Sequence, residues 1–239
     1  MIPMQRTIDW KAVYQTSLME TGSCYTHCGG YCCKNFHAND FHILSAKEVI
    51  LPLVESEYDY LMSLGGMAGI SEDAQCEEFA PIEGHSIQLY FMKCSCEGLC
   101  SPHCHRPFVC RLYPYLPLID YGGHIVGFDY VALVDLFYSS QDKHPCYLVT
   151  HQQTIVQSQL RTALEPLIAN PEMIFLLKAS ELIVRSLRKK ITGTFDPKDD
   201  EGRKAFLKKY EYHVFTRSPW RTKEFRDEMA AIYRTSFGL

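Results

Sequence analysis

The stretch 116–134, LPLIDYGGHIVGFDYVALV, decides the β part of the fold. β-branched and aromatic residues dominate both of its halves, and YGGH at 121–124 separates the halves as the turn of a hairpin does. The same composition extends over 115–138 and recurs in HSIQLYFMK at 85–93. These segments therefore predict a small antiparallel sheet.

A helix is predicted near 45–64, upstream of these segments. Ser45 can cap its start, apolar residues recur at helical spacing along it, and Gly65-Gly66 follows its end. The acidic segment 72–83 comes next, and such charge runs are typical of solvated loops.

Beyond residue 150 the apolar pattern becomes helical. The predicted helices cover 151–169, 171–190, about 199–213 and 219–236. The fold class is therefore α+β: a small antiparallel sheet with a metal-binding Cys-rich region and a helical C-terminal part. We expect a Cys-rich region over 1–150 and a helical region over 151–239, which can also form one integrated domain.

Composition narrows the class of protein. The chain has 239 residues, of which 46% are apolar and 11 are cysteines, so it can form a core and is not disordered. No window is apolar enough to span a membrane, and the N-terminus does not resemble a secretory leader. We therefore expect a cytoplasmic protein without a membrane partner. In a reducing compartment, an odd and large number of cysteines indicates metal binding or redox chemistry rather than disulfides.

Charge divides the chain into an acidic and a basic part. Residues 1–175 carry 9 Lys and Arg against 19 Asp and Glu, whereas residues 176–239 carry 15 against 9. The basic helices allow a nucleic-acid-associated regulator as a third hypothesis. The chain as a whole is acidic, with a net charge of −4, which argues against a nucleic-acid partner. An intramolecular fit between the two parts is the plainer explanation.

Nine of the eleven cysteines lie in two windows. The first window, 24–33, has the spacing C-x3-C-x3-C-C, and the second window, 94–110, contains C-x3-C-x3-C-x5-C. Thiolates are soft ligands that suit zinc and iron. Cys76 and Cys146 lie outside the windows and are expected to pack as small apolar residues. The candidate metal ligands are Cys24, Cys28, Cys32, Cys33, Cys94, Cys96, Cys100, Cys104 and Cys110.

The first window predicts a loop wrapped around a metal. On a continuous helix its cysteines would form a stripe roughly 12 Å long at 1.5 Å per residue, too long for one ion. Gly29-Gly30 are the residues best suited to break such a helix. Cys32 and Cys33 are adjacent, and in an extended segment their side chains point to opposite faces. One of them then faces a second metal, a cluster or the core, and a redox pair is a further alternative.

Donor count alone leaves the kind of site open. Two mononuclear sites, one binuclear site, and one or two iron–sulfur clusters all fit nine thiolates. His27, His103 and His105 lie between the cysteines and are expected to be loop residues near the site rather than ligands. Arg106 and Arg111 flank Cys110, and we expect them to donate hydrogen bonds to thiolates.

The second window resembles a known family. The run from Cys100-Ser101 through RPFVCRLYP at 106–114 is similar to the C-S-x(4)-R-P-x-x-C-R-x-[FY]-P signature of the zinc- or iron-chelating cysteine-cluster (YkgJ-like) family. The first window resembles the Cys-Cys knot that precedes this signature in the family. The resemblance covers about 20–115. Its departures are a three-residue gap at 29–31, where the family has two, and the extra Cys104.

The resemblance implies a metal-binding protein and implies no reaction. Its ligands would be Cys24, Cys28, Cys32, Cys33, Cys100 and Cys110, with Cys94, Cys96 and Cys104 competing for the remaining positions. A more distant resemblance of the first window is to flagellin lysine N-methylases, which are associated with an iron–sulfur cluster. It raises the alternative of an iron–sulfur-dependent protein-modifying transferase, so whether the chain is an enzyme stays open.

Overall fold

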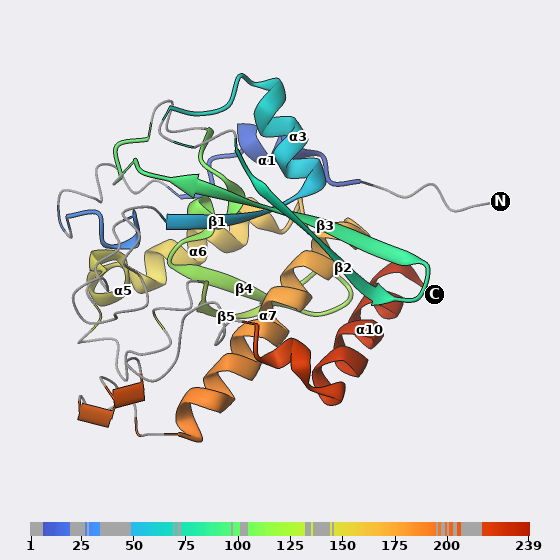
Figure 1. The fold of residues 1–239 in the computed structure, drawn as a ribbon. Helices are drawn as coiled ribbons and strands as arrows, with labels where there is room; N and C mark the ends of the chain where they lie inside the picture. Colours follow the sequence, from blue (N-terminus) through green and yellow to red (C-terminus); the bar gives the residue numbers. More distant parts are fainter. Residues whose placement is uncertain are drawn as a thin grey trace.

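The computed structural model describes residues 7–19, 27, 29–33, 49–68, 70, 73–96, 98–100, 105–131, 135, 144, 146–194, 196, 199, 201–202, 205–206 and 217–239 (Figure 1). Helices and short 3-10 turns (η) alternate with five strands. In chain order the elements are α1 (Trp10–Gln15), η1 (Tyr31–Cys33), β1 (Val49–Val54), α3 (Glu55–Ser63), β2 (Gln75–Ile82), β3 (His85–Cys94), α4 (Phe108–Leu112), β4 (Tyr115–Ile119), β5 (Ile125–Tyr130), α5 (Tyr147–His151), α6 (Gln153–Leu164), α7 (Pro171–Thr192), η6 (Pro219–Arg221) and α10 (Lys223–Phe237).

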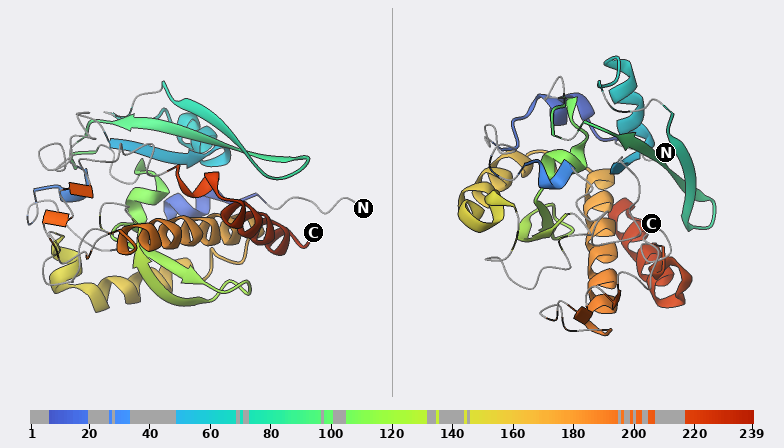
Figure 2. Two further views of the ribbon diagram at one scale, coloured as in Figure 1. Left: turned by 60° about the horizontal axis from the view of Figure 1, so that its bottom comes forward. Right: turned by 60° about the vertical axis from the view of Figure 1, so that its left-hand side comes forward.

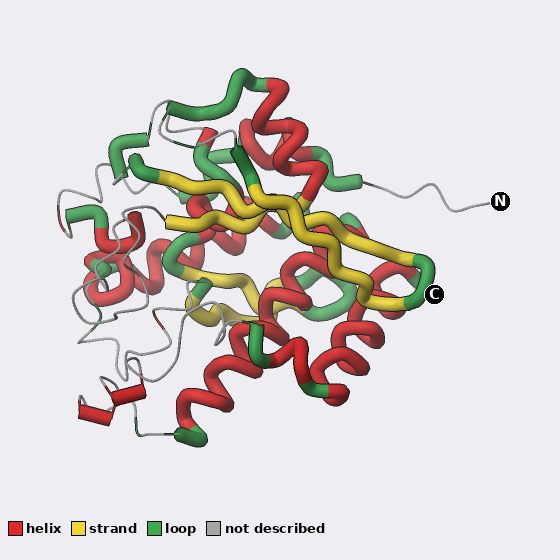
Figure 3. Tube along the Cα trace, viewed as in Figure 1, coloured by secondary structure: helices red, strands yellow, loops and turns green. Residues whose placement is uncertain are grey.

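The strands form two antiparallel sheets, which confirms the α+β class. One sheet has three strands in the order β1-β3-β2, and the other is the β4-β5 hairpin (Figure 3). In Figure 2 the long helix α7 runs between them, with the three-stranded sheet on one side and the hairpin on the other. Helix α10 packs against α7 and β2. The sequence predicted one sheet where the structure has two.

The hairpin forms as its sequence predicts. Tyr115 pairs with Tyr130 at the open end, and Ile119 pairs with Ile125 next to the turn. In the turn, the Asp120 carboxylate accepts a hydrogen bond of 2.8 Å from the His124 amide. Gly123 has a φ of 82°, a conformation that residues with a Cβ rarely adopt.

The predicted helix over 45–64 is wrong in its first half. Residues 49–54 form β1, which pairs with β3 along its length, and within the described part of this range the helix covers 55–63. Pro52 explains the strand, because it lacks an amide proton that a helix interior needs but is tolerated in an edge strand. The predicted end of this helix is confirmed, because Gly65 and Gly66 follow it and both have positive φ. The proposed cap, Ser45, lies outside the described residues.

The acidic segment is also not the loop that its charge predicts. Most of it is β2, which pairs with β3 from Gln75 opposite Phe91 to Ile82 opposite His85. Phe79 and Ile82 are partly buried in this strand, whereas Cys76 is exposed. The charged residues lie on a strand that also carries partly buried apolar residues. The charge run alone therefore did not reveal that this segment pairs with β3.

The C-terminal helices follow the predicted breaks with small differences. Asn170 caps α7 by accepting hydrogen bonds from the amides of Glu172 and Met173, directly before Pro171. The predicted helix 151–169 corresponds to α6, which ends at Leu164, and the short helix α5 precedes it. The predicted helix 219–236 begins with η6, and α10 follows. Most of the predicted helix 199–213 lies outside the described residues.

Two hydrophobic clusters hold these layers together. The main core contains buried residues from both sides of residue 150, such as Leu53, Leu116 and Leu177. The second core joins α7 to α10 through residues such as Phe175 and Met229. The ion pairs Arg188–Asp129 and Arg217–Glu77 link the basic C-terminal part to the acidic part, as the intramolecular explanation of the charge pattern expects. None of the described helices is long and apolar enough to cross a bilayer.

Candidate thiol site

Six of the nine candidate ligands lie within the described residues, and they come from four parts of the fold. Cys24, Cys28 and Cys104 lie outside the described residues. Of the others, Cys32 and Cys33 belong to η1, Cys94 ends β3, Cys96 and Cys100 follow that strand, and Cys110 lies in α4. All six are partly buried thiols rather than half-cystines.

The first window turns at its glycines. Gly29 and Gly30 have φ values of 63° and 78°, and the Cys33 amide donates a 2.8 Å hydrogen bond to the Gly30 carbonyl. This closes η1 and brings the Sγ atoms of Cys32 and Cys33 to 3.5 Å. The expectation that these two side chains point to opposite faces is therefore wrong, because the pair lies in a 3-10 turn and not in an extended segment.

Arg106 joins the two windows. Its Nε donates to Sγ of Cys100 at 3.4 Å, and its Nη2 donates to Sγ of Cys33 at 3.5 Å. The predicted contact between this arginine and thiol sulfur is therefore confirmed. Arg111 donates hydrogen bonds to the backbone carbonyls of Val13, at 2.8 Å, and Thr16. These hydrogen bonds connect α4 to α1 and to the residue that follows it.

The remaining thiols of the second window interact with the same group. The Cys96 thiol donates to the Ala68 carbonyl at 3.1 Å and interacts electrostatically with the thiols of Cys94 and Cys100. Cys110 interacts electrostatically with Cys33, Cys94 and Cys100. Thiols from both windows thus form one cluster, which we call the thiol cluster: Cys32, Cys33, Cys94, Cys96, Cys100 and Cys110.

Within the cluster, the environment raises the pKa of some thiols and lowers that of another. Burial raises the pKa of Cys94, Cys96 and Cys110, and neighbouring thiols raise those of Cys96 and Cys110 further. The hydrogen bond from Cys32 and the charge of Arg106 lower the pKa of Cys33, while the same sulfur–sulfur hydrogen bond raises that of Cys32. Cys33 is therefore the thiol of this pair that ionises first.

The described side chains of the thiol cluster do not form a complete metal coordination shell. Over the part of the chain that the structure describes, no three Cys, His, Asp or Glu side chains are spaced to hold one metal ion. His27 stacks on Tyr147, with ring centroids 4.4 Å apart. The donor chemistry nevertheless fits a thiophilic metal, because four of the six thiols, those of Cys32, Cys33, Cys100 and Cys110, interact with one guanidinium.

The two cysteines outside the windows behave differently from each other. Cys146 is buried in the main core, with 4% of its surface exposed, as predicted. Cys76 is exposed on β2, so its prediction as a packed apolar residue is wrong. Its Sγ lies 3.6 Å from the Gln88 side-chain oxygen on the paired strand.

Sequence reasoning missed three buried polar residues near these elements. Glu57 is 3% exposed and accepts hydrogen bonds from the Tyr14 hydroxyl, at 2.9 Å, and the Phe108 amide, at 2.6 Å. Asp135 and His144 form a fully buried pair, with 3.1 Å between Nε2 and Oδ1. Nothing local in the sequence marks any of them as buried.

Comparisons with known proteins do not extend this description. No protein-family model, curated protein or solved structure matches the chain. The resemblance to the cysteine-cluster family therefore stays a prediction from the motif residues.

Proposed function

We propose that this protein is a metal-binding protein that chelates zinc or iron through thiolates from both cysteine windows. The proposal includes an iron–sulfur cluster as one form of the iron site and assigns no reaction. Its expected partner is the metal ion.

The observation that carries the proposal is the position of Arg106 between the two windows. One guanidinium contacts Cys33 and Cys100, which are 67 residues apart in the chain, at 3.5 and 3.4 Å. Several thiolates near one ion repel each other, and a fixed cation that donates hydrogen bonds to them offsets this repulsion. An arginine held between sulfur atoms therefore suits a thiolate-rich metal site.

The residues that would hold the metal are those of the thiol cluster. Cys33, Cys100 and Cys110 are the central candidates, because Arg106 interacts with all three. Cys32, Cys94 and Cys96 border them, and Cys24, Cys28 and Cys104 belong to the same two sequence windows. When bound, zinc would supply a structural cross-link, and iron would supply redox capacity. The protein's part is to bring the two windows together and to balance their charge.

The experiment that tests this proposal compares metal content between cysteine variants. Cys33→Ser, Cys100→Ser and the matched control Cys76→Ser are purified without oxygen, and zinc and iron per chain are measured by mass spectrometry. We expect the first two variants to lose at least half of the bound metal, and the control, whose thiol is exposed on β2, to keep it. Equal metal content in all three variants would refute the ligand assignment.

A further inference from the structure

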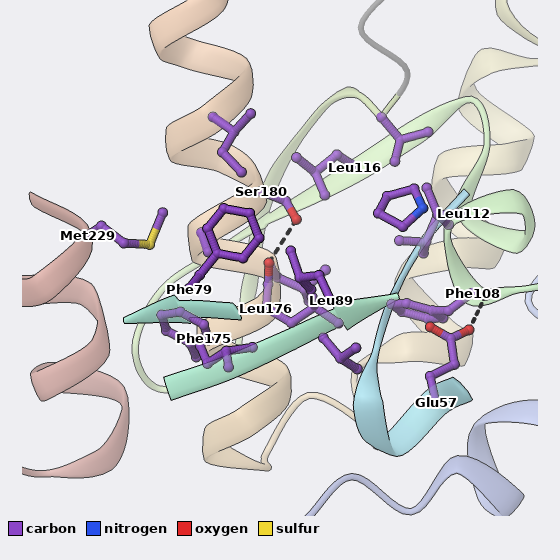
Figure 4. Close-up of a pocket in the computed structure, with 18 of the residues that line it drawn as sticks. Glu57, Phe79, Leu89, Phe108, Leu112, Leu116, Phe175, Leu176, Ser180 and Met229 are labelled. Carbon is purple, nitrogen blue, oxygen red and sulfur yellow. Dashed lines mark hydrogen bonds between the residues drawn. The ribbon is translucent and has the colours of Figure 1, made fainter. Parts of the chain in front are cut away.

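A cavity of about 190 Å³ lies where the main core meets the second core. Figure 4 shows its lining side chains, with Glu57 and Phe108 at one end and Phe79 and Met229 at the other. Phe108 belongs to the main core and Met229 to the second core. The cavity is partly open to solvent, so a ligand can reach it from the surface.

The lining is apolar except at the Glu57 end. Ser180 also borders the cavity, but its hydroxyl already donates to the Leu176 carbonyl at 2.8 Å. Glu57 is different, because both of its hydrogen bonds, from Tyr14 and from the Phe108 amide, reach the same atom, Oε1. Within the part of the chain that the structure describes, Oε2 has no hydrogen-bond donor. Glu57, which is 97% buried as a residue, thus lines the cavity with a carboxylate of which one oxygen has no hydrogen-bond donor among the described residues.

A carboxylate that borders an apolar cavity is costly to hold there, and a cation is the partner that offsets this cost best. The charge of Arg111 acts on Glu57 from nearby, and the Arg111 guanidinium also donates to the Val13 and Thr16 carbonyls. An apolar cavity of about 150 Å³ is large enough to bind benzene, so this cavity accommodates an aromatic ring with a short side chain. Shape and charge together define a ligand with an apolar body and one cationic end.

We propose that this cavity binds a small apolar amine, whose body lies between the two cores and whose ammonium group donates a hydrogen bond to Oε2 of Glu57. The proposal is independent of the metal, since no residue of the thiol cluster lines the cavity. Such a site is an ordinary form of small-molecule pocket, mostly apolar with one convergent polar group.

The test uses two probes of equal size, phenethylamine and propylbenzene, each with about nine non-hydrogen atoms. The full-length protein is labelled with ¹³C at its methionine methyl groups and titrated in turn with each probe. Met229 lines the cavity, whereas Met173 is fully buried away from it and serves as the internal control. We expect phenethylamine to shift the Met229 signal and to bind at least tenfold more tightly than propylbenzene, with no shift at Met173.

Variants assign the preference to the carboxylate. Glu57→Gln keeps the shape of the side chain and is expected to abolish the tenfold preference, while Glu224→Gln, at an exposed position of α10, is expected to keep it. Ala179→Leu fills the cavity from α7 and is expected to abolish binding of both probes. If both probes bind the wild type equally, the assignment of the amine to Glu57 is overturned. If neither shifts Met229, the cavity is only a packing gap between the two cores.

Discussion

The buried carboxyl of Glu57 should make the stability of the fold depend on pH. Burial raises its pKa from 4.5 to about 7, and this effect exceeds the opposing effects of the Phe108 and Tyr14 hydrogen bonds and of the Arg111 charge. The folded state therefore binds this proton more tightly than the unfolded state. Stability from this group is present below pH 4.5 and is lost as the pH rises through about 7.

The size of the effect follows from the two pKa values. The difference between 4.5 and about 7 corresponds to about 3.5 kcal/mol at about 1.4 kcal/mol per pKa unit. Because Glu57 is 3% exposed, solvent screening reduces this value little. Between pH 5 and pH 8 the expected loss is about 2.5 kcal/mol.

Urea unfolding of the wild type and of Glu57→Gln at several pH values measures this effect. Trp10 and Trp220 report unfolding by fluorescence, since Trp10 is buried in the main core and Trp220 packs against the second. Glutamine cannot ionise and keeps an oxygen that accepts from Tyr14 and Phe108. The difference in unfolding free energy between variant and wild type should change by about 2.5 kcal/mol from pH 5 to pH 8. A change below about 0.5 kcal/mol, equal to that of the exposed control Glu224→Gln, would refute the reasoning.

Three further substitutions test the fold and the site. Gly123→Ala should destabilise the protein by roughly 1–2 kcal/mol in urea unfolding, because φ is 82° there and a Cβ would lie 3.4 Å from the Ile168 carbonyl oxygen, while Gly127→Ala in the neighbouring strand should cost less. Asp135→Asn should cost about 1–3 kcal/mol by weakening its buried contact with His144, and a melting temperature equal to wild type would contradict this. Cys146→Ser should leave the metal content unchanged, since this thiol is packed in the main core, and a loss of metal would place it among the ligands.

Local sequence signals predicted the parts of the fold that local interactions decide. The β4-β5 hairpin follows from its turn, and α7 follows from the Asn170-Pro171 start. Strand β1 could not be found in this way, because its pairing with β3 joins residues about forty positions apart and overrode an apparent helical spacing. Strand β2 was missed for a different reason: it pairs with β3 across a short turn, but its charges masked a partly covered face.

The residue types of the candidate site could be predicted from the sequence, but the way its side chains meet in space could not. The spacing of the cysteines identified the two windows, and the position of Arg106 beside Cys110 suggested its contact with sulfur. The sequence could not show that this arginine bridges Cys33 and Cys100, because the contact depends on how η1 and α4 meet. Glu57 carried no signal at all, because its burial depends on α1 and α4 closing over it.

The most direct test of the central claim is the analysis of zinc, iron and acid-labile sulfide in the full-length protein purified without oxygen, together with its optical spectrum. The account predicts a fixed amount of metal per chain, either colourless zinc or coloured, thiolate-ligated iron. Folded protein that contains neither metal, and whose thiol-cluster cysteines all react freely with a thiol reagent, would contradict it.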